Sequence, residues 1–218
     1  MAVAALGFGP HVLAFVAGTF PISAVAHFHG ALMVSWLLLL VTQSVLAARG
    51  RIDLHRKVGD MAKWLGAAIW ISIVAMTIRG FMDHRYPLNE NIYYSLPQFY
   101  VITVFGLLFP AAFVLRSNPP WHKRFMVIAT MSLLQAAVDR FSWPPFHTPD
   151  YWPQIACLDI LLVMLIAFDL ITIKRVHRAT LVGGGVLLAS QSAVALIWPT
   201  AWWHDACLWL ARAFGGVL

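Results

Sequence analysis

Long apolar runs, separated by short loops that carry charge, largely determine which fold this chain can adopt. Six runs approach or reach the roughly 20 apolar residues that a helix needs to cross a bilayer, and they lie at 30–48, 64–78, 97–115, 125–141, 154–173 and 181–198. Backbone polar groups inside a bilayer must be paired within the protein, so such runs are expected to be helices. The pattern predicts an all-α, polytopic transmembrane helix bundle that forms a single domain over residues 1–218.

The two ends of the chain fit this pattern less well. Residues 2–20 are apolar, but Gly7, Gly9 and Pro10 weaken them as a helix. The stretch "PTAWWHDACLWLARAF" at 199–214 is short and polar, and its tryptophans suit a helix that lies among lipid headgroups. We therefore expect six firm spans, a marginal N-terminal span and a C-terminal interfacial helix.

Composition and charge narrow the range of partners. Hydrophobic residues make up 61% of the 218 residues and charged residues 11%, which leaves too little polar surface for a soluble domain. The net charge of +6 comes from basic residues in loops beside the spans, where they mark membrane topology. The expected partner is a lipid bilayer and not a nucleic acid, since no nucleic-acid-binding motif is present.

The distribution of basic residues predicts an orientation. Three alternate loops, 49–63, 116–124 and 174–180, contain 11 of the 15 Lys and Arg residues. Loops that are rich in Lys and Arg stay on the cytoplasmic side of a bacterial inner membrane. We expect these three loops to be cytoplasmic and the C-terminus to lie outside.

A histidine between an apolar and a basic residue recurs in these three loops. The words are "LHRK" at 54–57, "WHKR" at 121–124 and "VHRA" at 176–179, so His55, His122 and His177 form one layer at the cytoplasmic face. One interpretation is that the histidines and their basic neighbours anchor the topology at lipid phosphates. The other adds Asp169, about one turn inside the same face, to give three imidazoles and a carboxylate, which suffice to bind a transition metal. The neighbouring cations oppose such binding.

A second set of candidate residues lies toward the opposite face. In "HFHG" at 27–30, His27 and His29 could hold a metal together if the segment is extended, because alternate side chains then share a face. Further polar candidates are His84, Asp139, Arg140 and Asp159. Haem is the other cofactor considered, although it needs two facing histidines within the apolar layer and these histidines lie at its edges.

Three functions remain open at this stage. The first is metal or haem binding through the histidines at the membrane edges, for redox chemistry or metal handling. The second is a small transporter or proton-coupled permease, in which Asp159, Asp169, Gln43 and Gln191 line a polar path. The third is a structural or accessory subunit of a membrane complex, or a homo-oligomer. The sequence leaves open whether the protein is an enzyme.

Several short motifs together resemble a family of uncharacterised bacterial multi-pass inner-membrane proteins. They are "GFGP" (7–10), "HFHG" (27–30), "LHRKVG" (54–59), "HKRFM" (122–126), "FDLITIKRVHRAT" (168–180) and "SQ" (190–191). The resemblance implies a bundle of six to seven helices and no established activity. The recurrent histidines of that family correspond to His27, His29, His55, His122 and His177, with Asp169 beside the last motif. A longer apolar stretch usually precedes the motif similar to "GFGP", so a shortened N-terminus is expected.

Overall fold

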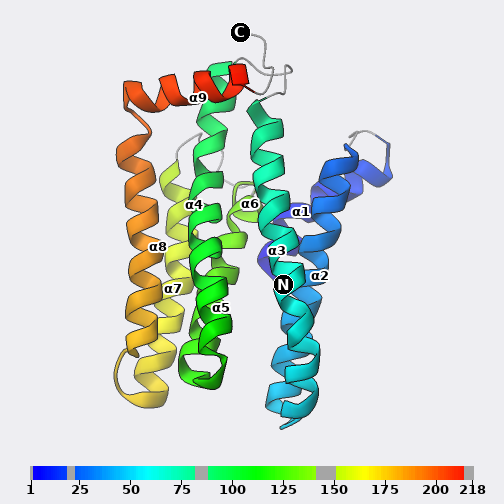
Figure 1. The fold of residues 1–218 in the computed structure, drawn as a ribbon, viewed down its shortest axis with the longest axis vertical. Coiled ribbons are helices and arrows are strands. Elements are labelled where there is room, and N and C mark those ends of the chain that lie inside the picture. The colour runs from blue at the N-terminus through cyan, green and yellow to red at the C-terminus, as the bar shows by residue number, and fades with distance from the viewer. Residues whose placement is uncertain (1, 19–22, 82–87, 141–150, 214–218) are drawn as a thin grey trace.

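The computed structural model describes residues 2–18, 23–81, 88–140 and 151–213, and all regular elements in these ranges are helices (Figure 1). They are α1 (Ala2–Val16), α2 (Ala24–Ala48), α3 (Ile52–Phe81), α4 (Leu88–Val114), the short 3-10 helix η1 (Leu115–Ser117), α5 (Pro119–Leu133), α6 (Gln135–Val138), α7 (Tyr151–Ile173), α8 (Arg178–Ile197) and α9 (Ala201–Ala213). The expected all-α class is confirmed.

Five helices in the described residues are long and apolar enough to cross a membrane. They are Ala24–Ala48, Ile52–Gly80, Gln98–Ser117, Ile155–Ile173 and Arg178–Ile197, which correspond to five of the six expected spans. Most begin several residues earlier than hydropathy indicates. The fold is therefore compatible with a multi-pass membrane protein. α1, with 15 residues, is a shorter apolar helix.

The sixth expected span, 125–141, is not one continuous helix. α5 ends at Leu133, and at Leu134 the backbone changes from i→i−4 to i→i−3 hydrogen bonds: the Leu134 N–H donates to Met131 O at 3.0 Å, and the Ala137 N–H donates to Leu134 O at 2.9 Å. The short helix α6 then packs against α1 so closely that a Cβ on Gly7 would lie 2.1 Å from Ala137 O. The break therefore coincides with tertiary packing between α6 and α1, which cannot be predicted from hydropathy.

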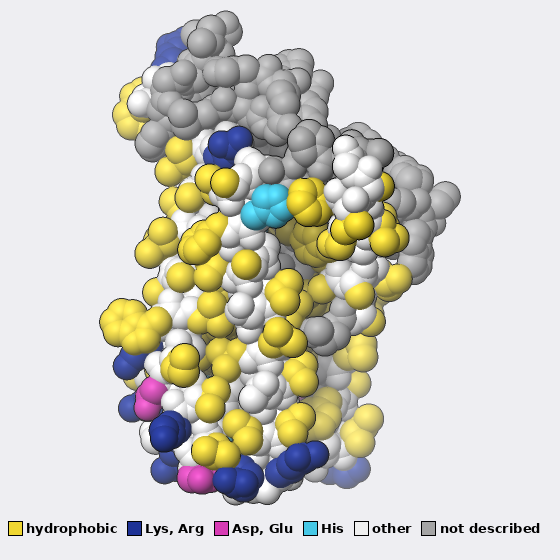
Figure 2. All heavy atoms as spheres, turned by 90° about the vertical axis from the view of Figure 1, so that its right-hand side faces the viewer, with side chains coloured by type: hydrophobic (Ala, Val, Ile, Leu, Met, Phe, Trp, Pro, Cys, Tyr) yellow, Lys and Arg dark blue, Asp and Glu magenta, His cyan; other side chains and the backbone are white. Residues whose placement is uncertain are grey.

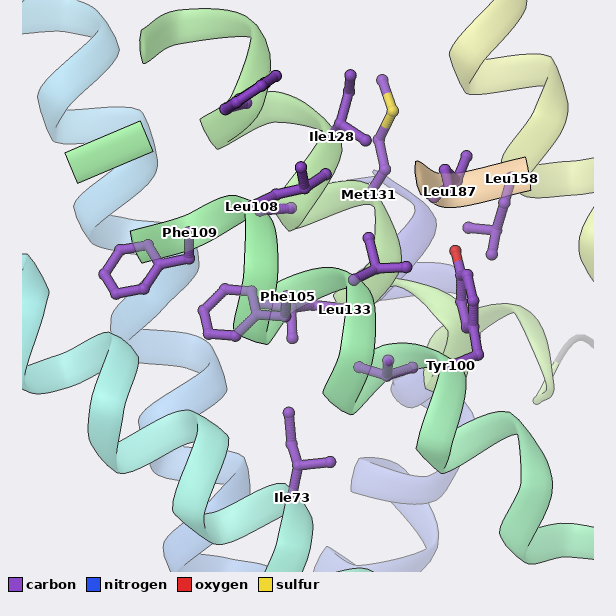
Figure 3. Packing of buried hydrophobic residues seen from close by; sticks show 14 of the residues in the cluster. Ile73, Tyr100, Phe105, Leu108, Phe109, Ile128, Met131, Leu133, Leu158 and Leu187 are labelled. Carbon is purple, nitrogen blue, oxygen red and sulfur yellow. The ribbon is translucent and has the colours of Figure 1, made fainter. Parts of the chain in front are cut away.

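The core lies between α4, α5, α7 and α8. Figure 3 shows Phe105, Leu108 and Phe109 from α4 beside Ile128 and Met131 from α5, Leu158 from α7 and Leu187 from α8. α2 is attached to this core through Trp36, whose Nε1 donates to Thr130 Oγ1 at 3.3 Å and whose ring meets Phe105 edge-on. Van der Waals packing at this core holds the helices of the bundle together.

The two ends of the bundle differ in charge. The turns α2–α3, α4–α5 and α7–α8 lie at the lower end in Figure 1, and we call this end, with loops 49–63, 116–124 and 174–180, the basic end. Figure 2 shows Lys and Arg gathered there, below a side covered by hydrophobic side chains. α9 lies across the opposite end, with Trp203 and Cys207 buried and Trp202 and Trp209 exposed. That arrangement suits the expected interfacial helix.

Candidate functional site at the basic end

His55, in the first turn of α3, closes the turn between α2 and α3. Its Nδ1 lies 3.2 Å from the backbone oxygen of Gln43, and the Gln43 side chain returns a bond from Nε2 to the His55 oxygen at 3.0 Å. A carbonyl oxygen can only accept a hydrogen bond, so Nδ1 of His55 must carry the proton. The lone pair of the neutral ring is then on Nε2.

His122, in the first turn of α5, makes the equivalent contact between α4 and α5. Its Nδ1 lies 2.8 Å from the backbone oxygen of Ala112, near the end of α4. The same reasoning places the proton on Nδ1 and the lone pair on Nε2. His55 and His122 therefore connect two different hairpins in the same way and carry the same tautomer.

The structure brings these two rings together. The ring centroids of His55 and His122 are 6.3 Å apart, with an angle of 88° between the ring planes. Both side chains are half-buried. A metal-ligating histidine almost always donates its second ring N–H to a carbonyl or carboxylate, which fixes the ring and directs the other nitrogen to the metal. Both rings already donate Nδ1–H to a backbone oxygen in this way.

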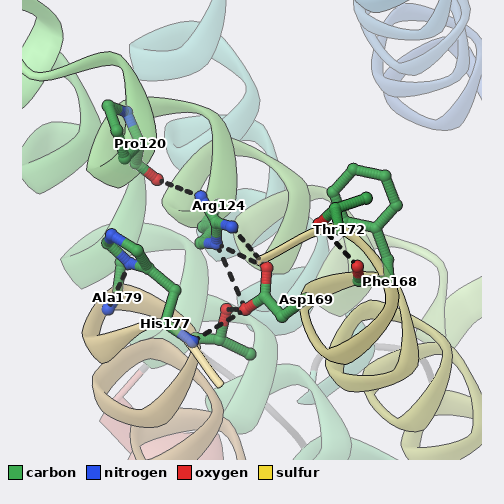
Figure 4. Close-up of polar contacts among 8 residues, drawn as sticks. Pro120, Arg124, Phe168, Asp169, Thr172, His177 and Ala179 are labelled. Atoms are coloured by element: carbon green, nitrogen blue, oxygen red, sulfur yellow. Dashed lines mark hydrogen bonds and ion pairs between the residues drawn. The ribbon is translucent and has the colours of Figure 1, made fainter. Parts of the chain in front are cut away.

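Asp169 does not join them, because its carboxylate is bound by other groups (Figure 4). Arg124 donates from Nε to Oδ1 at 3.0 Å and to Oδ2 at 3.3 Å, and from Nη2 to Oδ1. The Thr180 hydroxyl and the His177 backbone N–H both donate to Oδ2, at 2.5 and 3.0 Å. With Arg124 4% and Asp169 0% exposed at the side chain, this cluster connects α5, α7 and α8 as a buried ion pair.

His177 has a different role from the other two histidines of its layer. It is the N-cap of α8, and its Nδ1 accepts the Ala179 N–H at 3.0 Å, so the proton of the neutral ring is on Nε2. Burial, and then the cation of Arg124, lower the pKa of His177 from its ordinary value of 6.5, which favours this neutral form. Its ring meets Trp121, with centroids 6.1 Å apart.

His27 and His29 are separated because α2 begins earlier than expected. Ser23 caps α2, with its hydroxyl accepting the Ala26 N–H at 3.3 Å, so both histidines are helical. Residues two apart on a helix point in nearly opposite directions. His27 packs edge-on against Phe15, with centroids 4.8 Å apart, whereas Nδ1 of His29 lies 2.9 Å from Ser72 Oγ on α3.

The remaining candidates make other contacts. Asp139 accepts a hydrogen bond from Gln135 Nε2 at 2.7 Å, and the Arg140 guanidinium lies 4.9 Å from the centroid of the Phe8 ring. Asp159, on α7, has a buried Oδ1 that lacks a hydrogen-bond partner. His84 lies outside the described residues.

Sequence reasoning missed Arg124 as the partner of Asp169, and missed the backbone acceptors of His55 and His122. The partner of Asp169 could have been sought from the sequence, because a carboxylate inside a membrane needs a partner. Arg124 is the basic residue of "WHKR" that points into the bundle. Within the described ranges, no group of three or more His, Cys, Asp or Glu side chains is arranged to hold a metal.

Comparison with known proteins adds no relative: no family model, curated protein or solved structure matches the chain. The class that the fold supports is thus an all-helical protein with five helices of membrane-spanning length. The most organised candidate site in the described part of the chain is the pair formed by His55 and His122.

Proposed function

We propose that this chain is a multi-pass bacterial inner-membrane protein that binds a transition metal ion between His55 and His122, in metal handling or redox chemistry. The observation that carries this proposal is the matched arrangement of the two rings. Each donates Nδ1–H to a backbone oxygen, and their centroids are 6.3 Å apart. Both Nε2 lone pairs remain for a ligand.

The geometry suits a small coordination centre. Imidazole nitrogen binds Zn, Cu, Fe and Ni, with bonds of about 2.0–2.1 Å to zinc, so two rings with centroids 6.3 Å apart are close enough to share one ion when their Nε2 atoms turn toward it. The remaining positions would be taken by water or by a transferred ligand. Haem, held by one imidazole on each side of the iron, is the alternative use of the same two nitrogens.

Charge sets the expected strength of binding. Arg56, Lys57 and Lys123 lie within two residues of the two histidines in the sequence, and fixed positive charge weakens the binding of a divalent cation. Two protein ligands also bind less tightly than the four of a structural zinc site. The proposed site therefore exchanges its ion readily, which fits metal handling better than a structural role. With basic loops inside, it faces the cytoplasm.

Asparagine is the informative replacement for both histidines. The amide nitrogen of Asn can take the place of Nδ1 as the donor to Gln43 O or Ala112 O, while the Nε2 ligand is removed. We expect the detergent-purified protein to bind Zn²⁺ or Cu²⁺ in equilibrium dialysis with elemental analysis. His55→Asn and His122→Asn should each lose this binding.

The matched control is His177→Asn, because asparagine is a good N-cap and preserves the acceptor for the Ala179 N–H. This variant should bind metal as the wild type does. An absorption spectrum of the purified protein separates the two cofactors, since haem gives a strong Soret band and a directly bound ion does not. Equal metal binding by wild type, His55→Asn and His122→Asn would refute the proposal.

A further inference from the structure

Four polar side chains from four helices lie at one depth in the bundle. The contacts at the basic end fix the register: Ala112 is level with His122, and Asp169 with Arg124 and Thr180. Counting from these contacts, Tyr100 is 12 residues away along α4, Gln135 is 11 along α5 and α6, Asp159 is 10 along α7 and Gln191 is 11 along α8. At 1.5 Å per residue, all four lie about 15–18 Å from the contacts.

That depth is near the middle of a bilayer, whose hydrocarbon core is about 30 Å thick. We call Tyr100, Gln135, Asp159 and Gln191 the mid-membrane polar layer. The layer coincides with the interruption at Leu134 between α5 and α6. Interrupted helices at the bilayer midplane are where many transporters bind their substrates, because the irregular backbone is tolerated where it lines a site.

Two members of the layer have buried polar atoms without a partner. Gln191 is only 3% exposed, and its Nε2 has no hydrogen-bond acceptor. The Oδ1 of Asp159 is buried and has no donor. Leaving such groups unsatisfied costs about 1–3 kcal/mol each, and more for a charged group. Both are therefore positioned to bind something that the polypeptide does not supply.

Asp159 is the carboxylic acid of the layer. Arg124 is bound to Asp169, and among the described residues no cation pairs with Asp159. A carboxylate at this depth is costly without a counter-ion. A cationic donor would satisfy Asp159 Oδ1, and an oxygen acceptor would satisfy Gln191 Nε2.

The space below the layer limits the size of a ligand. One to two turns toward the basic end, a Cβ on Gly184 would lie 3.1 Å from Leu162 Cδ1, so α7 and α8 are in close contact there. Aromatic residues lie toward the opposite end of the bundle, where the rings of Phe99 and Trp203 are packed edge-on with centroids 5.2 Å apart. A ligand between α7 and α8 at the level of the layer would therefore have to be small.

We infer that Asp159 and Gln191 form a mid-membrane binding site for a small molecule that carries an amine and an oxygen acceptor, of the amino-alcohol class. The ammonium group donates to Asp159 Oδ1, and the oxygen accepts from Gln191 Nε2. This site is independent of the His55–His122 pair, since it uses other helices and lies at a different depth.

The test is equilibrium binding of radiolabelled ethanolamine to the detergent-purified full chain, with three unlabelled competitors: ethanolamine itself and two analogues. Ethylamine retains the charge but lacks the acceptor, and ethylene glycol retains oxygen but lacks the charge. Ethanolamine should compete best. Asp159→Asn should weaken ethanolamine binding roughly 10- to 100-fold, and Gln191→Leu roughly 3- to 10-fold, as expected for losing a charged and a neutral hydrogen bond.

Each variant should also change the preference among the probes. Asp159→Asn should bind ethanolamine no better than ethylene glycol, and Gln191→Leu no better than ethylamine. The matched control is Asp205→Asn, at an exposed position of α9, which should bind all three probes as the wild type does. The inference is overturned if the wild type does not bind ethanolamine, or binds the three probes equally. That result needs no variant, so it holds even if a substitution prevents folding.

Discussion

The His55–His122 pair and the Arg124–Asp169 cluster occupy the same end of the bundle but use their polar groups in opposite ways. In the cluster, both carboxylate oxygens accept hydrogen bonds, from Arg124, Thr180 and the His177 backbone. In the pair, each histidine satisfies one backbone oxygen and retains the lone pair of its other nitrogen. Three similar sequence motifs therefore serve two purposes: the cluster fixes helices, and the pair remains available for a ligand.

Removal of Arg124 should have the largest effect on stability. Arg124→Met leaves the fully buried Asp169 carboxylate without its cation, and breaking a buried pair in this way costs about 3–5 kcal/mol. The free energy of unfolding, measured with denaturant in detergent micelles, should fall by that amount.

The matched control for Arg124→Met is Arg116→Met at the same end of the bundle. Arg116 pairs with Asp60 at 3.1 Å, but both side chains are more than half exposed. An exposed pair contributes about 0–1 kcal/mol. Equal losses in the two variants would show that Asp169 is not held as the structure describes.

Removal of one neutral donor from the cluster should have an intermediate effect. Thr180→Val preserves the shape of the side chain but removes the hydroxyl that donates to Asp169 Oδ2, which should cost about 1–3 kcal/mol. Thr172→Val is the control, because the Thr172 hydroxyl is exposed and bonds only its own helix at Phe168 O. A loss of stability in Thr172→Val as large as that in Thr180→Val would contradict this ranking.

The sequence predicts the coarse arrangement of these regions better than their contacts. Hydropathy and basic loops were enough to predict most helices and to place His55, His122 and His177 in one layer, because both signals are local. The contacts that distinguish the roles of the three histidines could not be predicted. The acceptors Gln43 O and Ala112 O are backbone atoms, which every residue has, so the residue types do not reveal them. The need of Asp169 for a partner was predictable, whereas Arg124 was interpreted only as a topology signal.

Two other differences between the sequence prediction and the structure concern where helices begin and end. "HFHG" suggests a shared metal site only if it is extended, and the cap at Ser23 makes it helical. The run 125–141 is apolar enough to be interpreted as one span, and the packing of Gly7 against Ala137 accompanies its interruption. Both outcomes depend on contacts between segments distant in sequence or on the exact start of a helix, which periodicity does not determine.

The smallest expected effect concerns pH and distinguishes His177 from the other two histidines. Burial and the cations of Arg124, Arg175 and Lys123 lower the pKa of His177 below 6.5 in the folded protein. The unfolded chain then binds the proton more readily than the folded one, so stability is complete above pH 6.5 and falls as the pH drops below it. Protonation also removes the Nδ1 acceptor that caps α8. His177→Asn, with a cap that does not titrate, should reduce this loss when thermal unfolding is measured from pH 7 to pH 5, and an unchanged pH dependence would show that His177 does not cap α8 as a neutral ring.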